Sequence, residues 1–216
     1  MRHLDRSKAN PPTCLSCYRH GLNSWNDLTA EDRMQIWEQL AKMQGELCAY
    51  CESRISEGSR HLEHFRDKHR HPTLTFNWEN LLGCCMSTDS CGHYKDSTAD
   101  GYDPTQLIDP TIDDPDRFFS FRTDGTITVR VDDLTDAEHL RAAETLRVLN
   151  LDDKRGRLRK CRKTAVDVYL STYPDLLSEL QACDEVSRRD FAEYEISCIA
   201  NDPYSTPIRH LLKSCI

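Results

Sequence analysis

The residues best suited to chemistry are cysteines and histidines gathered in the first half of the chain. A Cys-x-x-Cys pair, Cys48 and Cys51, is followed by three further cysteines, Cys84, Cys85 and Cys91. Thiolates bind Zn²⁺ tetrahedrally, and a Cys-x-x-Cys turn places two of them at the required separation. Two of the three later cysteines are therefore predicted to complete a structural zinc site, which would contribute directly to the folding free energy.

Side chains typical of phosphodiester hydrolysis lie among and just after these cysteines. Glu63 and His64 are adjacent, Asn80 follows them, and His93 comes shortly after the last cysteine. A neutral His can deprotonate water because its pKa lies near the working pH, and one divalent metal can orient the phosphate and neutralise the leaving oxygen. Because adjacent strand residues point to opposite faces, Glu63 and His64 can share a site only at a bend or a strand end.

Other histidines and cysteines have simpler explanations. Taken singly, His61, His69, His71 and His93 are each expected on the solvated surface. The pair Cys14 and Cys17 has no partner pair nearby and is expected to consist of structural thiols.

Length and composition are those of an ordinary soluble protein. The 216 residues suffice for one medium domain or two small ones, with 38% hydrophobic and 30% charged residues. No apolar run approaches the ~18 residues that span a bilayer, and the N-terminus lacks the apolar stretch of a signal peptide. We therefore expect a cytoplasmic protein without membrane contact. Eleven cysteines, an odd number, fit metal ligands or free thiols better than complete disulfide pairing.

Charge is unevenly distributed along the chain. The net charge of −8 is a mild argument against nucleic-acid binding, because phosphate contacts require Lys and Arg. Acidic residues crowd into 96–138, whereas basic residues concentrate in 54–71 and 154–163. The basic side chains predicted to contact nucleic acid are Arg60, Arg66, Lys68, Arg70, Arg155, Arg159 and Lys163. A solvated helix face, or a surface for an acidic partner, explains the second group equally well.

Apolar periodicity and end signals divide the chain into four regions. We expect an N-terminal arm and helix in 1–45, a metal-binding core with a hairpin and a short helix in 46–98, an acidic loop and β-hairpin in 99–134, and a helical region in 135–216. Within the last region, further helices are predicted at about 153–169, 174–182 and 188–199.

Two capping boxes mark the clearest helix starts. Thr29-Ala-Glu-Asp32 and Thr135-Asp-Ala-Glu138 each place an acid three residues after an N-cap threonine. The first helix is predicted to reach about Met43, with Gly45 as its stop. Its predicted buried face is Met34, Trp37, Leu40 and Ala41. The predicted buried face of the second helix is Leu140, Thr145, Leu146, Leu149 and Leu151.

The sequence of the metal-binding core resembles the HNH (ββα-metal) nucleases. The stretches that carry this resemblance are Cys48-Ala-Tyr-Cys51, His61-Leu-Glu63-His64-Phe65, Asn80-Leu81-Leu82 and Cys91-Gly-His93-Tyr-Lys95. More narrowly, they are similar to the PtuB-type nuclease subunits of Septu anti-phage defence and of some retron systems. The resemblance implies an α+β fold with a zinc-clamped ββα-metal core and mainly helical N- and C-terminal additions.

The resemblance also implies roles for particular residues. His64 corresponds to the general base, Glu63 and His93 to ligands of a catalytic Mg²⁺ or Mn²⁺, and Asn80 to the residue that positions the loop carrying the base. In the family the second metal ligand often follows the cysteine directly, whereas here Gly92 occupies that position. The family spacing selects Cys48, Cys51, Cys85 and Cys91 as zinc ligands, with Cys84 as the alternative to Cys85.

Partners and substrate follow from the same resemblance. The family's nuclease works with an ABC/SMC-type ATPase subunit and, in retron versions, with a reverse transcriptase and its RNA–DNA product. DNA is the expected substrate. An effector that cleaves RNA such as tRNA, and a non-catalytic zinc module that only tethers partners, remain the alternatives, since a metal-bound phosphate site does not choose between sugars.

Overall fold

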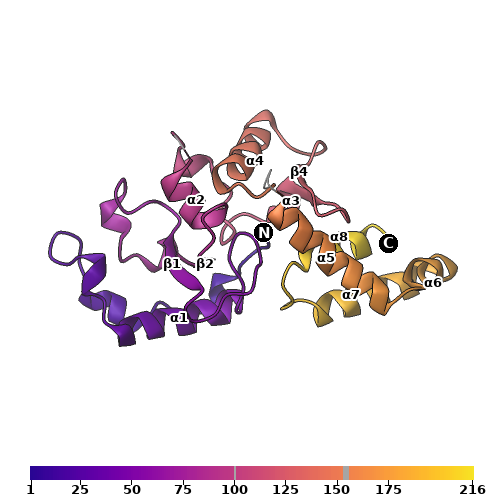
Figure 1. Cartoon of the computed structure of the whole chain (residues 1–216), viewed down its shortest axis with the longest axis horizontal. Coiled ribbons are helices and arrows are strands. Elements are labelled where there is room, and N and C mark those ends of the chain that lie inside the picture. Colours follow the sequence, from indigo (N-terminus) through magenta and orange to yellow (C-terminus); the bar gives the residue numbers. More distant parts are fainter. Residues whose placement is uncertain (100, 153–155) are drawn as a thin grey trace.

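The computed structural model describes residues 1–99, 101–152 and 156–216 (Figure 1). Its helices are α1 (Ala30–Gln44), α2 (Cys91–Ser97), α3 (Pro115–Phe118), α4 (Asp136–Leu149), α5 (Arg157–Thr172), α6 (Leu176–Ala182), α7 (Glu185–Cys198) and α8 (Thr206–Lys213). Its strands are β1 (Arg60–His64), β2 (Leu81–Cys85), β3 (Phe119–Phe121) and β4 (Ile127–Val129). Within the described residues the strands form two separate two-stranded sheets, so the architecture is mixed α and β with small sheets.

A β-hairpin and the short helix α2 form the centre of the N-terminal half. Strands β1 and β2 are antiparallel, with Arg60 opposite Cys85 and His64 opposite Leu81. Every residue of β2 is buried, because α1 and α2 both contact this strand. The hairpin and short helix predicted for 46–98 are therefore present, and they bring Glu63, Cys85 and Cys91 into one small unit.

Helix α1 begins at the predicted capping box, but its buried face is rotated from the prediction. Thr29 caps the Asp32 amide and Gly45 ends the helix with a positive φ of 65°. The buried apolar residues are Ile36, Leu40 and Met43, which share one face at helical spacing. Met34 is 56% exposed and Ala41 is also exposed, so these two assignments were wrong.

Gln44 connects α1 to the hairpin through polar contacts. Its side-chain amide donates to the carbonyls of Leu47 and Gly83, and its carbonyl accepts from the Gly83 amide. Buried backbone groups need such partners because leaving them unpaired is costly. This polar residue therefore completes the hydrogen bonding at the middle of β2.

The second half contains the predicted hairpin and helices, with two differences. The predicted start of one helix, at residue 153, lies outside the described residues. Strands β3 and β4 pair around Gly125, whose φ is 86° and where a Cβ would lie 2.0 Å from the Arg159 carbonyl oxygen. Thr135 caps α4 as predicted, but Leu140 is 67% exposed, whereas Ala142 and Val148 are buried. Helix α8 was not predicted, although Pro207 in its first turn is a known start signal.

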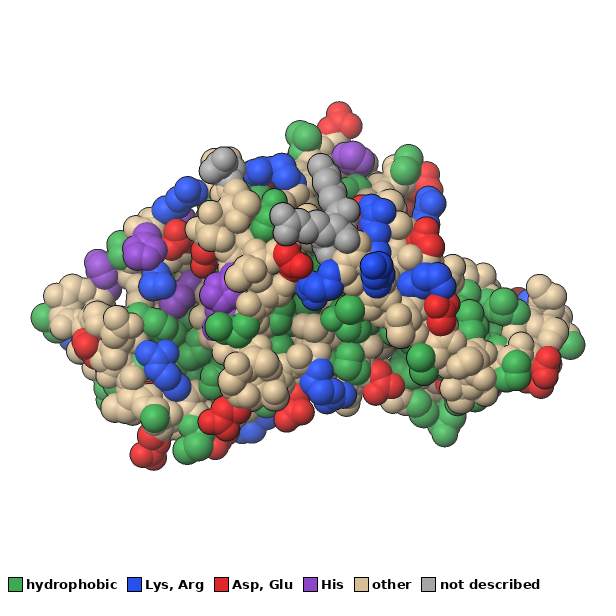
Figure 2. All heavy atoms as spheres, in the orientation of Figure 1, with side chains coloured by type: hydrophobic (Ala, Val, Ile, Leu, Met, Phe, Trp, Pro, Cys, Tyr) green, Lys and Arg blue, Asp and Glu red, His purple; other side chains and the backbone are tan. Residues whose placement is uncertain are grey.

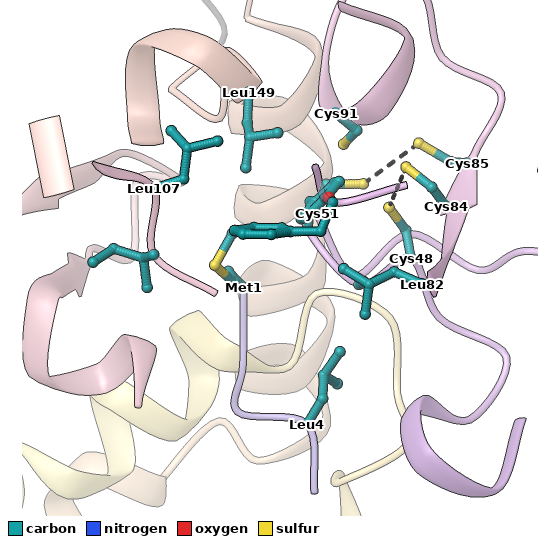
Figure 3. Close-up of a cluster of buried hydrophobic side chains, with 14 of the residues drawn as sticks. Met1, Leu4, Cys48, Cys51, Leu82, Cys84, Cys85, Cys91, Leu107 and Leu149 are labelled. Carbon is teal, nitrogen blue, oxygen red and sulfur yellow. Dashed lines mark hydrogen bonds between the residues drawn. The ribbon is translucent and has the colours of Figure 1, made fainter. Parts of the chain in front are cut away.

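Two apolar clusters form the interior. The larger one extends from Met1 and Leu4 through the β1–β2 unit to Leu107, Leu149 and Leu158 (Figure 3). The smaller one joins α5 to α8 through side chains that include Val166, Tyr169, Leu176, Leu180 and Leu212. The predicted helical region 135–216 therefore contributes to both clusters, with α4 in the first.

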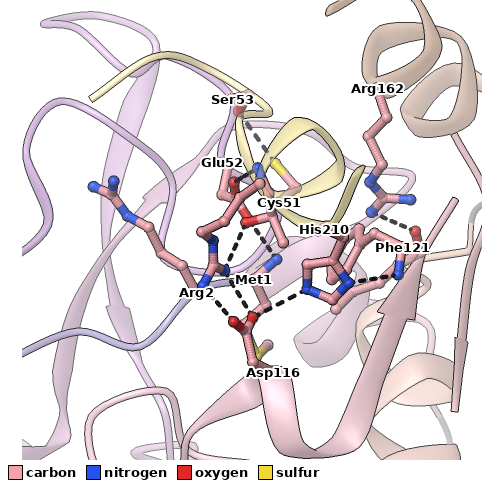
Figure 4. A network of polar contacts seen from close by, with 12 residues as sticks. Met1, Arg2, Cys51, Glu52, Ser53, Asp116, Phe121, Arg162 and His210 are labelled. Atoms are coloured by element: carbon pink, nitrogen blue, oxygen red, sulfur yellow. Dashed lines mark hydrogen bonds and ion pairs between the residues drawn. The ribbon is translucent and has the colours of Figure 1, made fainter. Parts of the chain in front are cut away.

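Buried polar groups tie the two halves together (Figure 4). Glu52, in the turn after α1, accepts from the amide and hydroxyl of Thr206 at the start of α8. Arg162 of α5 is fully buried and donates to the carbonyls of Gly125 and Leu151. His210 of α8 donates to Asp116 and accepts from the Phe121 amide. These contacts fix α8 against the β1–β2 side and the β3–β4 hairpin.

Membrane insertion has no support among the helices of the described ranges, none of which combines the length and apolar character needed to cross a bilayer.

Candidate metal and catalytic site

Four buried thiols converge beside the β1–β2 hairpin (Figure 3). Cys48 and Cys51 come from the turn after α1, Cys85 ends β2, and Cys91 begins α2. Their sulfur atoms all lie within 4.8 Å of one another. Two thiolates bound to one tetrahedral Zn²⁺ at ~2.3 Å lie about 3.8 Å apart, and the Cys51–Cys85 sulfur distance is 3.9 Å. This set of four cysteines fits a zinc ion and could hold one as a structural metal.

Cys91 reaches the cluster through an uncommon backbone conformation. Its φ is 63°, in the left-handed region that residues with a side chain rarely adopt. Such conformations persist where the surroundings hold them, and they occur often at functional sites. The position of Cys91 in the thiol cluster gives a reason for this one.

Cys84, the alternative ligand, is also close but differently engaged. Its sulfur lies 3.6 Å from the Cys48 sulfur and accepts from the Gly92 amide at 3.4 Å. Burial raises the pKa of each of the Cys48, Cys84 and Cys91 thiols well above the usual value. Several thiolates in so small a volume therefore require a cation, and the close four-sulfur set contains Cys85 rather than Cys84.

Glu63 is the buried charge at the centre of the ββα unit. It is 1% exposed, and its Oε1 accepts from Lys95 at 3.0 Å and from the Tyr50 hydroxyl at 3.2 Å. Its Oε2 lies 3.2 Å from Nε2 of His61. Burial alone would raise the pKa of the Glu63 carboxyl, but Lys95 and His61 lower it to about 2. The carboxylate is therefore ionised at neutral pH.

Gly92 makes room for this carboxylate. A Cβ on Gly92 would lie 2.2 Å from Oε2 and 2.6 Å from the carboxyl carbon of Glu63. The position that departs from the usual HNH pattern is thus a close approach of α2 to β1. A larger residue there could not coexist with Glu63 in its present place.

Replacing Gly92 by Ala is therefore expected to destabilise the protein by about 1–3 kcal/mol, the range for overpacking a core. Urea unfolding measures the loss. Ser97→Ala, on the exposed side of the same helix, should leave the free energy of unfolding nearly unchanged. Equal stability of Gly92→Ala and the wild type would contradict the close packing of Gly92 on Glu63.

His61 joins Glu63 and His93, although the sequence interpretation placed it on the surface. Its side chain is 22% exposed, and its ring centroid lies 4.3 Å from that of His93. The signal available in the sequence was alternation: residues two apart on a strand share a face, so His61 and Glu63 had to point the same way. The placement of His93 beside them depends on α2 and had no local signal.

His64 occupies the other side of β1. Its Nε2 lies 3.0 Å from the Thr75 carbonyl oxygen, and Trp25 packs edge-on against its ring with centroids 4.4 Å apart. Because a carbonyl can only accept, Nε2 carries the proton and Nδ1 has the lone pair in the neutral ring. Burial lowers the pKa of His64 to about 4, with the Thr75 contact opposing the shift. His64 is therefore neutral at physiological pH.

Asn80 fixes the loop that follows β1. Its Oδ1 accepts from the Arg66 amide at 2.8 Å, and its Nδ2 donates to the carbonyls of Arg66 and Leu74. These bonds span the loop between β1 and β2, and the Asn80 side chain that makes them is buried. The side chain thus holds the backbone next to His64 and Thr75 in place.

The predicted nucleic-acid contacts lie in two different settings. Arg60 packs over Trp37, Arg70 packs over Tyr102, and Arg66 is exposed. In the second group Arg159 pairs with Asp152 and Lys163 with Asp167, while Arg155 lies outside the described residues. Lys and Arg side chains are visible across the middle of the face in Figure 2. The two ion pairs reduce the availability of Arg159 and Lys163 to phosphate.

Two curated proteins are similar to parts of this chain. It is 37% identical to the Septu protein PtuB of Bacillus thuringiensis over 78 residues, which cover 35% of this chain and 28% of that protein. It is 33% identical over 102 residues to a Vibrio cholerae serotype O1 biovar El Tor protein named "Retron Vc95 putative HNH endonuclease", covering 44% of this chain and 47% of that protein. The chain thus spans less than half the length of these relatives. No protein-family model matches it. The resemblance to PtuB-type HNH nucleases is confirmed.

Proposed function

We propose that this chain, similar to PtuB-type HNH nucleases, is the metal-dependent endonuclease subunit of an anti-phage defence complex and hydrolyses phosphodiester bonds of DNA. The observation that carries the proposal is the buried His64 at the end of β1, bonded through Nε2 to the Thr75 carbonyl, with the buried Glu63 next to it in sequence on the other side of the strand. The thiol cluster lies in the same ββα unit, where bound zinc would hold the hairpin and α2 together.

His64 is proposed as the general base. The Thr75 carbonyl fixes the proton on Nε2, so Nδ1 is left to take a proton from the attacking water. Asn80 holds the backbone on the carboxyl side of His64. Lys95 adds a second restraint, because its buried ammonium donates to the His64 carbonyl oxygen at 2.8 Å. The base is thus positioned through its backbone and through its ring.

The proposed divalent cation, Mg²⁺ or Mn²⁺, belongs on the Glu63 side of β1, near His93. When bound it would neutralise charge on the scissile phosphate and on the leaving oxygen. Glu63 is ionised there and pairs with the buried Lys95 ammonium at 3.0 Å. His64 is the last residue of β1, and the proposal requires the substrate phosphate to approach both sides of the strand at this end.

DNA is the proposed substrate, with the exposed Arg66 near the strand end available to its backbone and Lys68 close behind it in the same loop. The test is incubation of the zinc-loaded chain with plasmid DNA and with total tRNA in Mg²⁺ or Mn²⁺. Because an ABC/SMC-type ATPase is the proposed partner, the assay is run with and without that subunit. Linearised plasmid supports the proposal, whereas cleavage restricted to tRNA would replace DNA by RNA as the substrate.

Cleavage is expected to tolerate mild acid. A base acts in its neutral form, and burial lowers the pKa of His64 from 6.5 to about 4. The rate should therefore stay constant as the pH falls from about 7 to about 5, and it should decline only as the pH approaches that pKa. Single-turnover cleavage across this range is the measurement, with zinc content followed at each pH because protonation releases thiolate ligands. A rate already halved near pH 6.5, with zinc intact and the divalent cation saturating, would contradict a desolvated His64.

A further inference from the structure

Two imidazole nitrogens near Glu63 are buried without a hydrogen-bond partner. Among the described residues, Nδ1 of His61 and Nε2 of His93 are inaccessible to solvent and make no hydrogen bond. Buried polar atoms are nearly always paired, so each exception calls for a missing partner. The two rings lie side by side, with centroids 4.3 Å apart and planes inclined by 44°. One ligand placed between them could satisfy both atoms.

Glu63, in contrast, already has its partners. Oε1 is held by Lys95 and Tyr50, and Oε2 faces Nε2 of His61. A carboxylate oxygen accepts, so this contact assigns a proton to Nε2 of His61 and leaves Nδ1 to present a lone pair. This is the arrangement in which a carboxylate orients a metal-binding histidine through the nitrogen that does not bind the metal.

We infer that His61 Nδ1 and His93 Nε2 bind the catalytic cation, and that Glu63 is a positioning residue that acts through His61. The inference rests on the proposed function and names the ligands of the same site. It adds His61 to the site, and it moves Glu63 from the predicted ligands to a supporting role.

The ligand types also select the metal. Imidazole suits transition-metal ions, whereas Mg²⁺ prefers oxygen ligands. The pair His61 and His93 therefore favours an ion such as Ni²⁺ or Zn²⁺ over Mg²⁺. Water and the substrate phosphate would fill the remaining positions.

The test is Ni²⁺ binding to the zinc-loaded protein, followed by calorimetry with zinc content measured separately. Losing a group that orients a metal ligand weakens metal affinity by about 10–100-fold, and losing a ligand itself should cost at least as much. His61→Gln and His93→Gln should each weaken Ni²⁺ binding to this extent, and His69→Gln, on an exposed histidine in the loop after β1, should not. Unchanged Ni²⁺ affinity of His61→Gln would overturn the inference.

A double-mutant cycle tests the role of Glu63. If Glu63 acts through His61, Glu63→Gln weakens Ni²⁺ binding in the wild-type background but adds nothing in the His61→Gln background. Additive losses would show that Glu63 binds the ion directly. As a readout without metal, long-range ¹H–¹⁵N NMR should place the His61 proton on Nε2, and a proton on Nδ1 would overturn the assignment.

Failure of this inference and failure of the proposed function give different results. If the protein cleaves DNA but His61→Gln binds Ni²⁺ as tightly as the wild type, the ligand assignment is rejected and the proposed nuclease function is retained. If Ni²⁺ binding depends on the two histidines but neither DNA nor RNA is cleaved, with or without the ATPase, the proposed nuclease function is rejected and the metal site is retained.

Discussion

Replacing Cys48 by Ser is expected to remove zinc from the protein and to unfold much of its N-terminal half. Cys48 is buried, and its sulfur belongs to the set of four that could hold the ion. Structural zinc contributes roughly 10–16 kcal/mol in small zinc domains, whereas whole proteins are stable by only about 5–15 kcal/mol. Loss of one ligand should therefore cost at least several kcal/mol. Thermal unfolding and zinc content, measured on the same sample, should fall together.

Two control variants separate loss of zinc from general damage to the core. Cys183→Ser changes an exposed thiol and should alter neither zinc content nor melting temperature. Cys84→Ser changes a fully buried thiol beside the cluster, so it should lower stability yet keep zinc bound. Cys85→Ser should lose zinc as Cys48→Ser does. Full zinc occupancy and unchanged melting of Cys48→Ser would contradict the structural role, and zinc loss in Cys84→Ser but not in Cys85→Ser would exchange the two ligands.

Local sequence signals predicted the helix starts but not which side of each helix is buried. The boxes at Thr29 and Thr135 depend on contacts three residues apart, and both form as predicted. The buried face depends on what packs against the helix. In α1 that neighbour is β2 together with the N-terminal arm, which selects Ile36 and Met43 rather than Met34. Leu140 fails in the same way, because α2 and the β3–β4 hairpin meet α4 on another side.

Motif spacing predicted the cluster of four thiols but not the contacts that surround Glu63. The pairing of β1 with β2 follows from the hairpin, and it places Cys85 next to the turn that contains Cys48 and Cys51. The contact of Glu63 with Gly92 depends on the angle at which α2 crosses the sheet. No short-range pattern encodes that angle. In the sequence, Gly92 therefore stands out only as a mismatch with the family pattern, and its packing against Glu63 is seen only in the structure.

For the basic run 154–163, the sequence likewise does not show which basic side chains are available to contact nucleic acid. Its composition predicts a phosphate-binding track, but its predicted contacts Arg159 and Lys163 pair with Asp152 and Asp167. Arg157 pairs with Asp89, which lies far away in the sequence. Arg162 is buried beneath the β3–β4 hairpin. Net charge along a segment therefore overstates the number of side chains available to nucleic acid.

The second large effect is expected from His64→Gln, which should abolish measurable cleavage while leaving the fold and zinc content intact. General-base catalysis contributes about 10²–10⁴-fold to a rate. Gln is chosen over Ala because its amide can still donate to the Thr75 carbonyl and fill the space beneath Trp25. It cannot accept a proton from water. Single-turnover cleavage of plasmid and tRNA, with the partner ATPase present, measures the loss.

The control for this variant is His69→Gln, on an exposed histidine in the loop after β1, which should cleave at the wild-type rate. Ni²⁺ affinity adds a second comparison. Because the His64 ring lies on the opposite side of β1 from Glu63, His64→Gln should bind Ni²⁺ as the wild type does, whereas His93→Gln should lose both binding and cleavage. Retained cleavage in His64→Gln would show that another group deprotonates the water. Loss of Ni²⁺ binding in the same variant would instead show that the two sides of β1 form a single metal site.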